Sequence, residues 1–470
     1  MALHKLRFDE PLLLRIAEIA DAEKVEAYVV GGYVRDRLLG VGGKDIDIVV
    51  MGDGPAFASI VAERLGRRPP VIFEKFGTAM LPVGEAEKIE FVTAREESYD
   101  AESRKPHVRK STLAGDLSRR DFTINAMAAS LNSRARGTIV DPFDGTGDLA
   151  RKILKTPLDP RRTFEDDPLR MMRAIRFAAK LHFQIAPETL EGIREKVSRI
   201  DIVSKERITD EFLKILASPK PSVGLKPMVE TGLAKYVFPE LVDMVGVEQR
   251  KDYHHKDVFL HTLKVVDSIC LMTDDVWLRF TALVHDIAKP RTKAFREGTG
   301  WTFHGHEDLG ARMMKPLFRR MRLPVEKLPY VEKLVRLHLR PMVLVSEEVT
   351  DSAIRRLVFD AGNDIDDLMA LCRADITSQN PSRVARYLKN YDIVVQKMKE
   401  VEEKDRLRNW QPPVRGEEIM QVCGIQPGPL VGILKKRIEE AILEGEIPNE
   451  HDAALEFLLR IKDPILHENP

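Results

Sequence analysis

The sequence predicts an α+β fold in which a small mixed α/β region precedes a long helical body. Up to about residue 150, short strand-like apolar runs alternate with helical segments, whereas beyond Asp141 the patterned segments have helical spacing. The chain of 470 residues is also longer than one hydrophobic core usually supports. We therefore expect about three or four domains.

The N-terminal region has the pattern of a mixed sheet with helices between its strands. Apolar residues recur at helical spacing over residues 8–20. Strand-like runs then cover residues 25–30, 46–51, 71–73, 79–83, 88–93 and 123–131. Residues 84–120 are rich in charge and poorly patterned. We expect part of that stretch to form a mobile loop.

Helical patterns dominate the rest of the chain. They cover residues 168–180, 188–198, 206–217, 256–272, 276–289, 307–322, 326–339, 351–373 and 383–402. Turn or breaker residues separate many of these segments, and prolines stand at positions 239, 341, 412 and 413. The sequence contains no internal repeat and no low-complexity tract. A long helical body is therefore expected after the sheet.

Composition narrows the class of protein and its compartment. The apolar share of 43% is ample for globular packing, and Lys+Arg equal Asp+Glu at 74 each, so any basic surface for a nucleic acid must be local. The three cysteines lie far apart and form no CxxC pattern, which indicates a reducing compartment. No run approaches the ~18 apolar residues of a membrane span. We expect a soluble, cytoplasmic protein without a membrane partner.

Two glycines and two aspartates form the first chemical motif. Gly31 and Gly32 follow a predicted strand and open a predicted helix that carries Arg35. Paired glycines are typical of a tight turn, and they also let the backbone approach an anion such as a triphosphate. Asp45 and Asp47 follow thirteen residues after Gly32, and their two-residue spacing on a strand points both carboxylates the same way. Such a pair suits two Mg²⁺ ions that activate a 3′ hydroxyl and neutralise a leaving pyrophosphate.

Four further blocks follow in order along the chain. Their sequences are RRDFTINA at 119–126, DPFDGTGDL at 141–149, DDPLR at 166–170 and SKERITDEF at 204–212. Together with the glycine and aspartate motif, they resemble the class II tRNA nucleotidyltransferases and bacterial poly(A) polymerases over essentially the whole chain. The resemblance implies a small polymerase-β-like nucleotidyltransferase head, followed by an elongated all-α body that contains an HD-type helical domain.

The resemblance also implies which head residues carry the chemistry. Asp45, Asp47 and Glu90 would be the catalytic carboxylates, the first two holding Mg²⁺; Glu90 lies on a predicted strand that is followed by the family's T-x-R pattern. The nucleotide-binding positions would be Gly31, Gly32, Arg35, Arg119, Arg120, Asp121, Asn125, Asp167, Arg170, Arg173 and Arg176. Arginines suit a polyphosphate, and Asp121 and Asn125 suit ribose hydroxyls.

Base selection without a template is the role that the family gives to its E-D-x-x-R helix. Asp167 and Arg170 are three residues apart and would share a helix face. A carboxylate can accept from an exocyclic amino group and an arginine can donate to ring acceptors, so the two can replace a base-pairing partner. An ordinary salt bridge within a helix has the same spacing. The family's usual Glu is Asp166 here, so no role is carried over to that position.

The second motif is a series of histidines and aspartates in the helical body. Seven of the twelve histidines fall between residues 254 and 338. The series His261, His285, Asp286, His306, His338 and Asp375 resembles the HD phosphohydrolase superfamily. In that superfamily imidazoles and carboxylates from separate helices bind one or two divalent metals that activate water. A single buried histidine is more often an ordinary core residue, but the whole series favours a metal site of unspecified metal.

Four segments are expected in total. They are a head at 1–155, a helical neck with the nucleotide-selecting helix at 156–245, an HD-type domain at 246–395 and an RNA-binding tail at 396–470. Within the neck, residues 204–212 resemble the family's brace helix, and residues 141–149 resemble the hinge between head and neck. Basic runs at 104–110, 319–322 and 435–437 are candidate contacts to RNA phosphates, although such runs are more often simply solvated faces.

The leading functional hypothesis is addition of CCA to the 3′ end of tRNA from CTP and ATP. Poly(A) addition, or addition of CC or A alone, uses the same chemistry and remains open. The chain end has no basic tail of the kind common in bacterial poly(A) polymerases. A hypothesis of another class is a metal-dependent phosphohydrolase centred on the HD motif. Under the leading hypothesis the partners are tRNA, ATP and CTP, and the cofactor is Mg²⁺.

Overall fold

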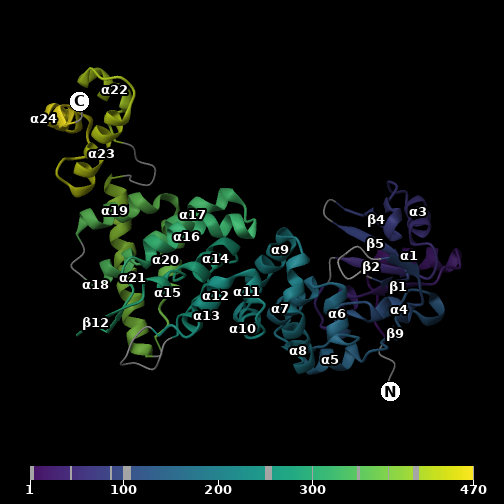
Figure 1. The fold of residues 1–470 in the computed structure, drawn as a ribbon. Coiled ribbons are helices and arrows are strands. Elements are labelled where there is room, and N and C mark those ends of the chain that lie inside the picture. Colours follow the sequence, from purple (N-terminus) through teal and green to yellow (C-terminus); the bar gives the residue numbers. More distant parts are fainter. Residues whose placement is uncertain are drawn as a thin grey trace. The chain divides into compact units, whose positions relative to one another are not determined.

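A computed structural model describes residues 5–42, 45–84, 87–98, 107–248, 257–298, 300–346, 350–378, 380–405 and 412–468. The chain forms two compact units, Met1–Val242 and Asp243–Pro470 (Figure 1). The first unit contains the main sheet and the helices that follow it. In the described part of the second unit, the regular structure is helical apart from one small hairpin. The α+β fold with a helical body, expected from the sequence, is confirmed.

The head of the first unit is built on a seven-stranded mixed sheet. Its strands are β1 (Ala27–Val30), β2 (Ile46–Val50), β3 (Val71–Phe73), β4 (Thr78–Pro82), β5 (Lys88–Thr93), β8 (Ala128–Ser130) and β9 (Ile139–Val140), in the order β3-β4-β5-β2-β1-β8-β9. The pair β2–β5 is parallel and every other neighbouring pair is antiparallel. β2 therefore lies at the centre of the sheet, beside β5.

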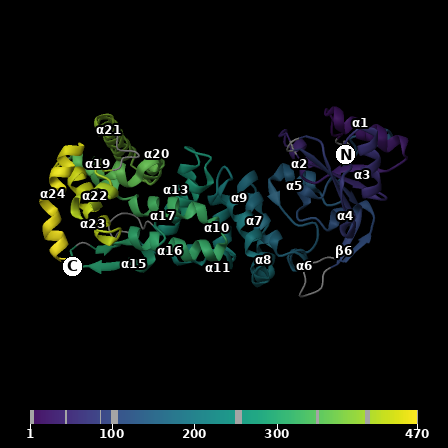
Figure 2. The ribbon, with the colours of Figure 1, turned by 90° about the horizontal axis from the view of Figure 1, so that it is seen from above.

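Helices cover one face of this sheet. These helices are α1 (Pro11–Ala22) and α3 (Gly54–Arg64), labelled in Figure 2. They place residues such as Ile16 and Phe57 in one core with Ile48 of β2 and Phe91 of β5. α3 begins where the Asp53 side chain accepts the N–H of Ala56, a usual N-cap contact. Strand residues alternate between faces, so Asp47 and Glu90 belong to the opposite face. This opposite face carries these carboxylates and a smaller core, in which Val49 of β2 packs with Leu117.

The remaining elements of the first unit follow or flank the sheet. The helices are α2 (Gly32–Leu38), α4 (Leu113–Ser118), α5 (Gly145–Arg151), α6 (Pro160–Asp166), α7 (Leu169–Leu181), α8 (Pro187–Lys196), α9 (Lys205–Leu216), α10 (Ser222–Glu230), α11 (Ala234–Val237) and α12 (Pro239–Asp243). Two small strand pairs complete it, β6 (Arg95–Ser98) with β7 (His107–Lys110) and β10 (Ile153–Leu154) with β11 (Gln184–Ile185).

The second unit is a helical bundle followed by a separate group of three helices. Its elements are α13 (Val258–Ile269), α14 (Val276–Val284), α15 (Lys289–Thr292), α16 (His306–Met321), α17 (Leu328–Leu337), α18 (Arg340–Ser346), α19 (Asp351–Ala361), α20 (Ile365–Ala374), α21 (Pro381–Asp405), α22 (Gly416–Cys423), α23 (Pro429–Glu444) and α24 (His451–Glu468), with the hairpin β12 (Ala294–Arg296) and β13 (Gly300–Thr302). The last three helices share a core around Ile419, Leu434 and Leu458.

Three expected elements differ in detail from the structure. The run 123–131 is a 3₁₀ turn, η2 (Thr123–Asn125), followed by β8, because polar side chains of Thr123 and Asn125 bond to Asp148 and Asp121. The expected helix 351–373 is two helices, since Gly362 has φ +56° and ends α19.

The third difference is in residues 84–120, where a mobile loop was expected. This stretch contains β5, the β6–β7 pair and α4, so much of it is regular structure. The part of the expectation that falls on residues 85, 86 and 99–106 lies outside the described residues, and so does the start of the basic run 104–110.

Membrane insertion was not expected from the sequence. Among the described residues, no helix is long and apolar enough to cross a bilayer.

Candidate active sites in the head and the helical bundle

Two carboxylates lie side by side on the open face of the head sheet. Asp47 of β2 is the direct register partner of Glu90 of β5, and residues paired in this way project to the same face. Asp45 is exposed and precedes the first residue of β2. Burial, Glu90 and Asp45 all raise the pKa of Asp47, while Arg120 opposes them. Such mutual repulsion is what a cluster of cation-binding carboxylates produces.

A glycine turn brings an arginine beside these carboxylates. Gly31 has φ +69° and caps α2, and its N–H donates to the carbonyl of Met127. A Cβ at this position would lie 2.7 Å from Nη1 of Arg120. The absence of a side chain at Gly31 therefore makes room for the Arg120 guanidinium at the N-terminus of α2.

Arg35 is placed inside the head and not at its surface. Its side chain is 4% exposed; Nη1 donates to Oδ1 of Asn125 at 2.7 Å and Nε donates to Oδ1 of Asp36 at 2.7 Å. The guanidinium also lies 5.1 Å from the ring centroid of Phe177. In this structure Arg35 connects α2, η2 and α7, which places it behind the glycine turn.

The two arginines of the RRDFTINA block share one buried carboxylate. Asp116 of α4 is fully buried; its Oδ1 accepts from Nη2 of Arg119 at 2.7 Å and its Oδ2 accepts from Nη2 of Arg120 at 3.2 Å. The backbone N–H of Arg95, at the start of β6, also donates to Oδ1 at 3.4 Å. Burial raises the pKa of Asp116, but both arginines outweigh it and lower the pKa overall.

Asp121 joins the head to α7. Its Oδ1 accepts from the Asn125 amide at 2.9 Å, and its Oδ2 lies 2.5 Å from Nη2 of Arg173. Although burial alone would raise it, the Arg173 charge and the Asn125 hydrogen bond lower the pKa of Asp121 to about 2. The Asp121 side chain is therefore ionised at any physiological pH, and the Arg173 guanidinium forms an ion pair with it.

Asp167 lies outside the helix that carries Arg170, which corrects the expectation that the two share a helix face. Asp167 is the C-cap residue of α6 with extended backbone, and Pro168 separates it from α7 because a proline disfavours helical backbone in the preceding residue. The Asp167 side chain accepts the N–H of Leu169 at 3.2 Å. Arg170 is 9% exposed, and its Nη2 donates to the carbonyl of Arg119 at 2.5 Å.

Arg176 belongs to a second ion pair of the neck. Its Nε donates to Oε2 of Glu211 in α9 at 2.6 Å, and both side chains are largely buried. The Phe177 ring has three guanidinium groups around it, at 4.1 Å for Arg176, 5.1 Å for Arg35 and 5.5 Å for Arg173. The negative face of an aromatic ring attracts cations, so the Phe177 ring helps to orient these guanidinium groups. α7 thus holds a packed arginine array.

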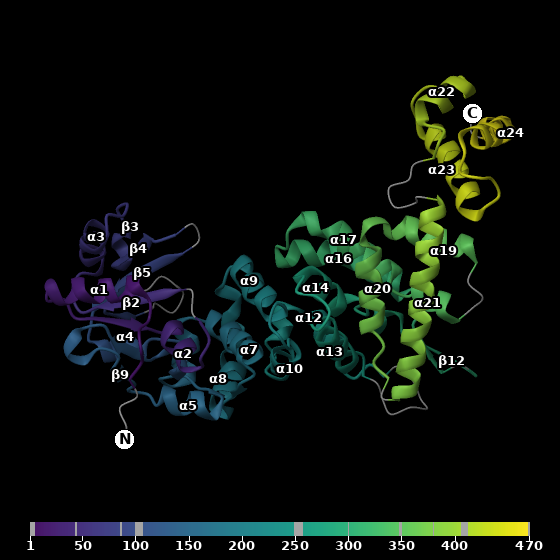
Figure 3. The ribbon, with the colours of Figure 1, turned by 180° about the vertical axis from the view of Figure 1, so that it is seen from behind.

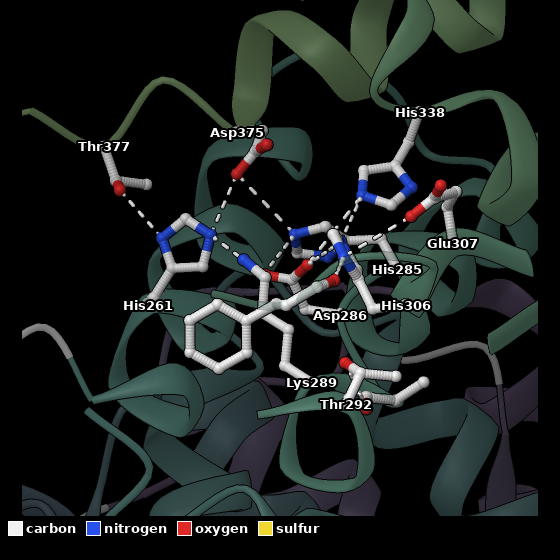
Figure 4. A network of polar contacts seen from close by, with 12 residues as sticks. His261, His285, Asp286, Lys289, Thr292, His306, Glu307, His338, Asp375 and Thr377 are labelled. Carbon is white, nitrogen blue, oxygen red and sulfur yellow. Dashed lines mark hydrogen bonds and ion pairs between the residues drawn. The ribbon is translucent and has the colours of Figure 1, made fainter. Parts of the chain in front are cut away.

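The helical bundle brings all six residues of the HD series together, with Asp286 in their midst (Figure 4). The Oδ2 atom of Asp286 lies 3.3 Å from Nε2 of His285 and 3.5 Å from Nε2 of His261. Its Oδ1 atom lies 3.2 Å from Nε2 of His306 and 3.8 Å from Nε2 of His338. Asp375 closes the group, with Oδ1 2.8 Å from Nε2 of His261.

Each imidazole is fixed through its other nitrogen. The Nδ1 atoms of His285, His306 and His338 lie 2.6–2.8 Å from the carbonyls of Ala282, Phe303 and Val335 respectively. Nδ1 of His261 is 2.8 Å from the Thr377 hydroxyl. A carbonyl only accepts, so Nδ1 of the first three rings carries the proton, and Nε2 is the atom available to a metal.

Burial and close contact with charged neighbours shift the pKa values of two bundle histidines in opposite directions. Burial alone would lower it, but Asp286 and Asp375 raise the pKa of His285 to about 10. Burial and the neighbouring His285 lower the pKa of His338 to about 3. Nε2 of His285 and Oδ1 of Asp286 are buried without an aligned hydrogen-bond partner among the described residues. Metal coordination would satisfy both atoms.

Two sets of donors fit a divalent metal. Ligand atoms of His261, His285 and Asp286 lie within 4.8 Å of one another, and so do those of Asp286, His306 and His338. Imidazole and carboxylate are the donors that zinc, manganese and iron accept. Asp286 belongs to both sets, so its two oxygens can serve two neighbouring ions.

Four residues of these sites were not identified from the sequence. Asp116 and Glu211 hold arginines of the head and neck, and Thr377 holds His261. The fourth is Lys289, whose Nζ lies 2.5 Å from Oδ2 of Asp286. Lys289 stands three residues after Asp286, and that i,i+3 spacing is a signal that could have found it. Asp116 stands three and four residues before Arg119 and Arg120, so the same kind of signal was present there. Glu211 and Thr377 depend on contacts between distant segments.

Comparison with protein families finds three matching domains. The poly(A) polymerase head domain matches residues 27–155, the probable RNA and SrmB-binding site of polymerase A matches residues 182–244, and the HD domain matches residues 258–378. Together they cover the head, part of the neck and the helical bundle.

Several relatives are similar over most of the chain. The A-adding tRNA nucleotidyltransferase of Deinococcus radiodurans is 31% identical over 438 residues, which are 91% of this chain and 94% of the relative. The multifunctional CCA protein of Methylococcus capsulatus is 36% identical over 325 residues, 67% of this chain and 72% of the relative. That of Nitrosococcus oceani is 33% identical over 367 residues, 75% and 84% respectively.

Solved structures have the same fold. An apo form of a CCA-adding enzyme aligns with a TM-score of 0.65 at 25% identity, covering 97% of this chain and 96% of the other. The Thermotoga maritima CCA-adding enzyme, solved in complex with tRNA, aligns with a TM-score of 0.63 at 22% identity, covering 98% and 100%.

Proposed function

Because the chain belongs to the family of tRNA nucleotidyltransferases, we propose that it extends the 3′ end of tRNA with the CCA nucleotides, taken from CTP and ATP. The observation that carries the proposal is the pairing of Asp47 with Glu90 on the open sheet face, next to Arg120 and the glycine turn. One cluster thus offers carboxylates for cations and a guanidinium for a polyphosphate.

In this proposal the head residues divide the work of phosphoryl transfer. Asp45, Asp47 and Glu90 are the carboxylates, and Mg²⁺ bound to them would lower the pKa of the attacking 3′ hydroxyl and neutralise the leaving pyrophosphate. Gly31, Gly32, Arg119 and Arg120 bind the triphosphate. Asp121 and Asn125 suit the ribose hydroxyls. The other three arginines, Arg35, Arg173 and Arg176, would support the site indirectly, because each is bonded to a buried side chain.

Asp167 and Arg170 are the proposed readers of the incoming base. Arg170 is anchored through its Nη2 to the Arg119 carbonyl, which fixes the plane of its guanidinium and leaves further N–H groups to donate. Asp167 lies at the break between α6 and α7, where its carboxylate can accept from an exocyclic amine. A rigid donor and acceptor pair selects bases by hydrogen bonding without a template.

Which nucleotides are added is the finer part of the proposal. The relatives include an A-adding enzyme and multifunctional CCA proteins, so addition of A alone is the main alternative. The division of the chain into a head (1–155), neck (156–245), HD domain (246–395) and RNA-binding tail (396–470) completes the proposal. We also propose that the enzyme is cytoplasmic, which is consistent with a role in tRNA processing.

The test is extension of a tRNA transcript that lacks its CCA end, with Mg²⁺ and each nucleoside triphosphate supplied singly and together. Addition of C, C and A that stops there, and is lost in the Asp45→Ala/Asp47→Ala variant, is the expected result. Addition of A only to a transcript ending in CC would identify an A-adding enzyme. A long A tract would identify a poly(A) polymerase.

A second activity is proposed for the HD site. The observation that favours it is the buried group of four imidazoles around Asp286, in which two donor sets share one carboxylate. Divalent metals bound there would supply a nucleophilic hydroxide, and Lys289 would place a positive charge beside a phosphoester. Hydrolysis of a 2′,3′-cyclic phosphate by wild-type protein, and its loss in Asp286→Asn, tests this activity.

A further inference from the structure

The edge strand of the head sheet is unusually apolar for a solvent-exposed segment. Every residue from 71 to 76 is exposed, and four of the six are large and apolar: Val71 (46% exposed), Ile72 (44%), Phe73 (46%) and Phe76 (41%). β3 has only β4 beside it, so it forms one edge of the sheet (Figure 3). Exposed apolar edge strands promote aggregation, and a contiguous apolar patch usually marks a binding surface.

The strand register places part of this surface on the face that carries the carboxylates. Val71 pairs with Met80, Met80 pairs with Glu90, and Glu90 pairs with Asp47. Directly paired residues project to the same side of a sheet, so the row runs unbroken from Val71 to Asp47. Phe73, two residues after Val71, shares this face. We name Val71, Phe73 and Met80 the apolar shelf.

Ile72 belongs to the other side. It pairs with Ala79, which is buried in the core beneath α1 and α3 together with Phe91. The same strand therefore presents one apolar side chain away from the carboxylates and two toward them. Their exposed fractions are nearly equal, at 44% for Ile72 and 46% for Val71 and Phe73. Ile72 can therefore serve as a matched control for Phe73.

The sheet order also separates the two reactants. Gly31 and Gly32, proposed for the triphosphate, follow β1 on one side of β2, and Nη1 of Arg120 lies against Gly31. Phosphoryl transfer is in line, with the attacking and leaving oxygens on opposite sides of the phosphorus. With the triphosphate on the β1 side of Asp47, we infer that the RNA 3′ hydroxyl approaches from the β5–β4–β3 side. The apolar shelf begins with Met80, one strand or about 5 Å beyond Glu90, and extends to Val71 and Phe73 on β3, about 10 Å beyond Glu90.

We propose that the apolar shelf is the binding site for the 3′-terminal nucleotide of the RNA that is extended, with its base stacked on Phe73. This inference rests on the proposed nucleotidyltransferase function and adds where the acceptor RNA is held. Stacking on an aromatic ring accepts every base, which suits an acceptor whose last base changes at each addition. Lys75, which is exposed, and Arg95, which donates to the Phe76 carbonyl, place positive charge at the end of the shelf for RNA phosphates.

The first experiment measures KM for tRNA and for CTP separately in wild-type, Phe73→Ser and Ile72→Ser proteins. We expect Phe73→Ser to raise KM for tRNA about tenfold or more, with KM for CTP changed less than about twofold. Phe73→Trp should restore the wild-type value, because a larger ring still stacks. Ile72→Ser should leave both constants unchanged. Equal effects of the two serine variants would overturn the proposal.

The second experiment reads stacking without catalysis. A tRNA transcript that ends in 2-aminopurine is titrated with each protein in the absence of nucleotide triphosphate. Fluorescence quenching by wild-type and Ile72→Ser proteins, but not by Phe73→Ser, supports the shelf even if extension itself is not observed. Equal quenching by all three proteins refutes it. Failure of wild-type extension with shelf-dependent quenching would instead refute the proposed reaction.

A second copy of the chain is the other occupant that an exposed edge strand can attract. Sedimentation of the wild-type and Phe73→Ser proteins distinguishes this case. A concentration-dependent dimer that Phe73→Ser and Ile72→Ser both dissociate would show that β3 is a subunit interface, and would overturn the RNA assignment. Unchanged monomers, together with the tRNA effect, support it.

Discussion

Asp116 is a buried carboxylate between the two arginines proposed to bind the triphosphate. Both of its oxygens are used, one by Arg119 and one by Arg120, and it is fully buried. It also accepts from the backbone of Arg95, where the β6–β7 pair begins. Asp116 touches no proposed substrate position itself. It is therefore a positioning residue for Arg119 and Arg120.

The substitution Asp116→Asn keeps the shape and removes the charge. Hydrogen bonds to charged groups contribute about 1.5–3 kcal/mol, so we expect KM for nucleoside triphosphate to rise about 10- to 100-fold. KM for tRNA should change little, which steady-state kinetics with each substrate varied in turn will show. A fall in thermal stability with both KM values unchanged would assign Asp116 a purely structural role.

Asp121 gives the head a predictable response to acid. Burial by itself would raise the pKa of Asp121, but Arg173 and Asn125 outweigh burial and lower it from the ordinary value of 3.8 to about 2. A lowered pKa means that its contribution is fully present above about pH 4 and is lost as pH falls towards 2. The contribution is about 2 kcal/mol at neutral pH.

Urea unfolding of wild-type and Asp121→Asn proteins from about pH 6 to about pH 2.5 measures this contribution. The difference in unfolding free energy between them should be constant down to about pH 4 and should then shrink. A difference that does not depend on pH would mean that Asp121 does not titrate with a lowered pKa. Near-UV circular dichroism at each pH verifies that both start folded.

Among the structural elements, the turn between β1 and α2 determines where Arg120 lies. Gly31 has φ +69°, and a Cβ there would meet Nη1 of Arg120 at 2.7 Å. Gly40 has nearly the same φ, +71°, but a Cβ added there would have nothing within 4 Å. Alanine at either position strains the backbone, but only at Gly31 does it also displace a functional side chain.

We expect Gly31→Ala to reduce kcat/KM for nucleotide addition at least about tenfold and Gly40→Ala to reduce it less than about threefold. Both should lose stability, at least about 1 kcal/mol, and Gly31→Ala should lose more because its Cβ also meets Arg120. Single-turnover addition and thermal unfolding of the two variants compare these effects. Equal loss of activity in both would show that backbone strain alone, and not the place of Arg120, explains the effect.

The bundle shows how secondary structure alone can orient a metal site. His285 and His338 stand immediately after α14 and α17, and His306 opens α16. Each ring bonds through Nδ1 to a carbonyl three residues earlier. Helix ends leave carbonyls unpaired, and these carbonyls determine the tautomer of two of the rings. The site is thereby oriented before any metal binds.

Across the full chain, the two proposed chemistries lie in different compact units. The head site belongs to Met1–Val242 and the HD site to Asp243–Pro470. Each site has its own carboxylates, and no residue is shared between the two. The two activities should therefore be separable by substitution.

Asp45→Ala/Asp47→Ala should abolish nucleotide addition and leave hydrolysis of a cyclic phosphate within about twofold of wild type. Asp286→Asn should do the reverse and lose bound metal, measured by elemental analysis after dialysis. Both assays are run on the same full-length preparations. Loss of both activities in either variant would contradict the independence of the two units.

The amino-acid sequence was enough to predict the fold class and to propose most of the candidate site residues. Periodicity separated the sheet region from the helical body, and local motifs such as Gly31-Gly32 with Asp45 and Asp47, or His285 with Asp286, identified candidate sites. Motifs of this kind are short because local structure imposes their spacing. Examples are a tight turn, two carboxylates two residues apart on one strand, and the end of a helix. Local geometry is what a sequence encodes directly.

Which of these groups meet was visible only in the folded chain. Arg173 pairs with Asp121 across 52 residues, Arg176 with Glu211 across 35, and Asp286 is shared by histidines from separate helices. The break at Pro168, which removes Asp167 from α7, also became visible only there. The register that aligns Val71 with Asp47 depends on how four strands pair. Such contacts come from packing distant segments, which local spacing does not specify.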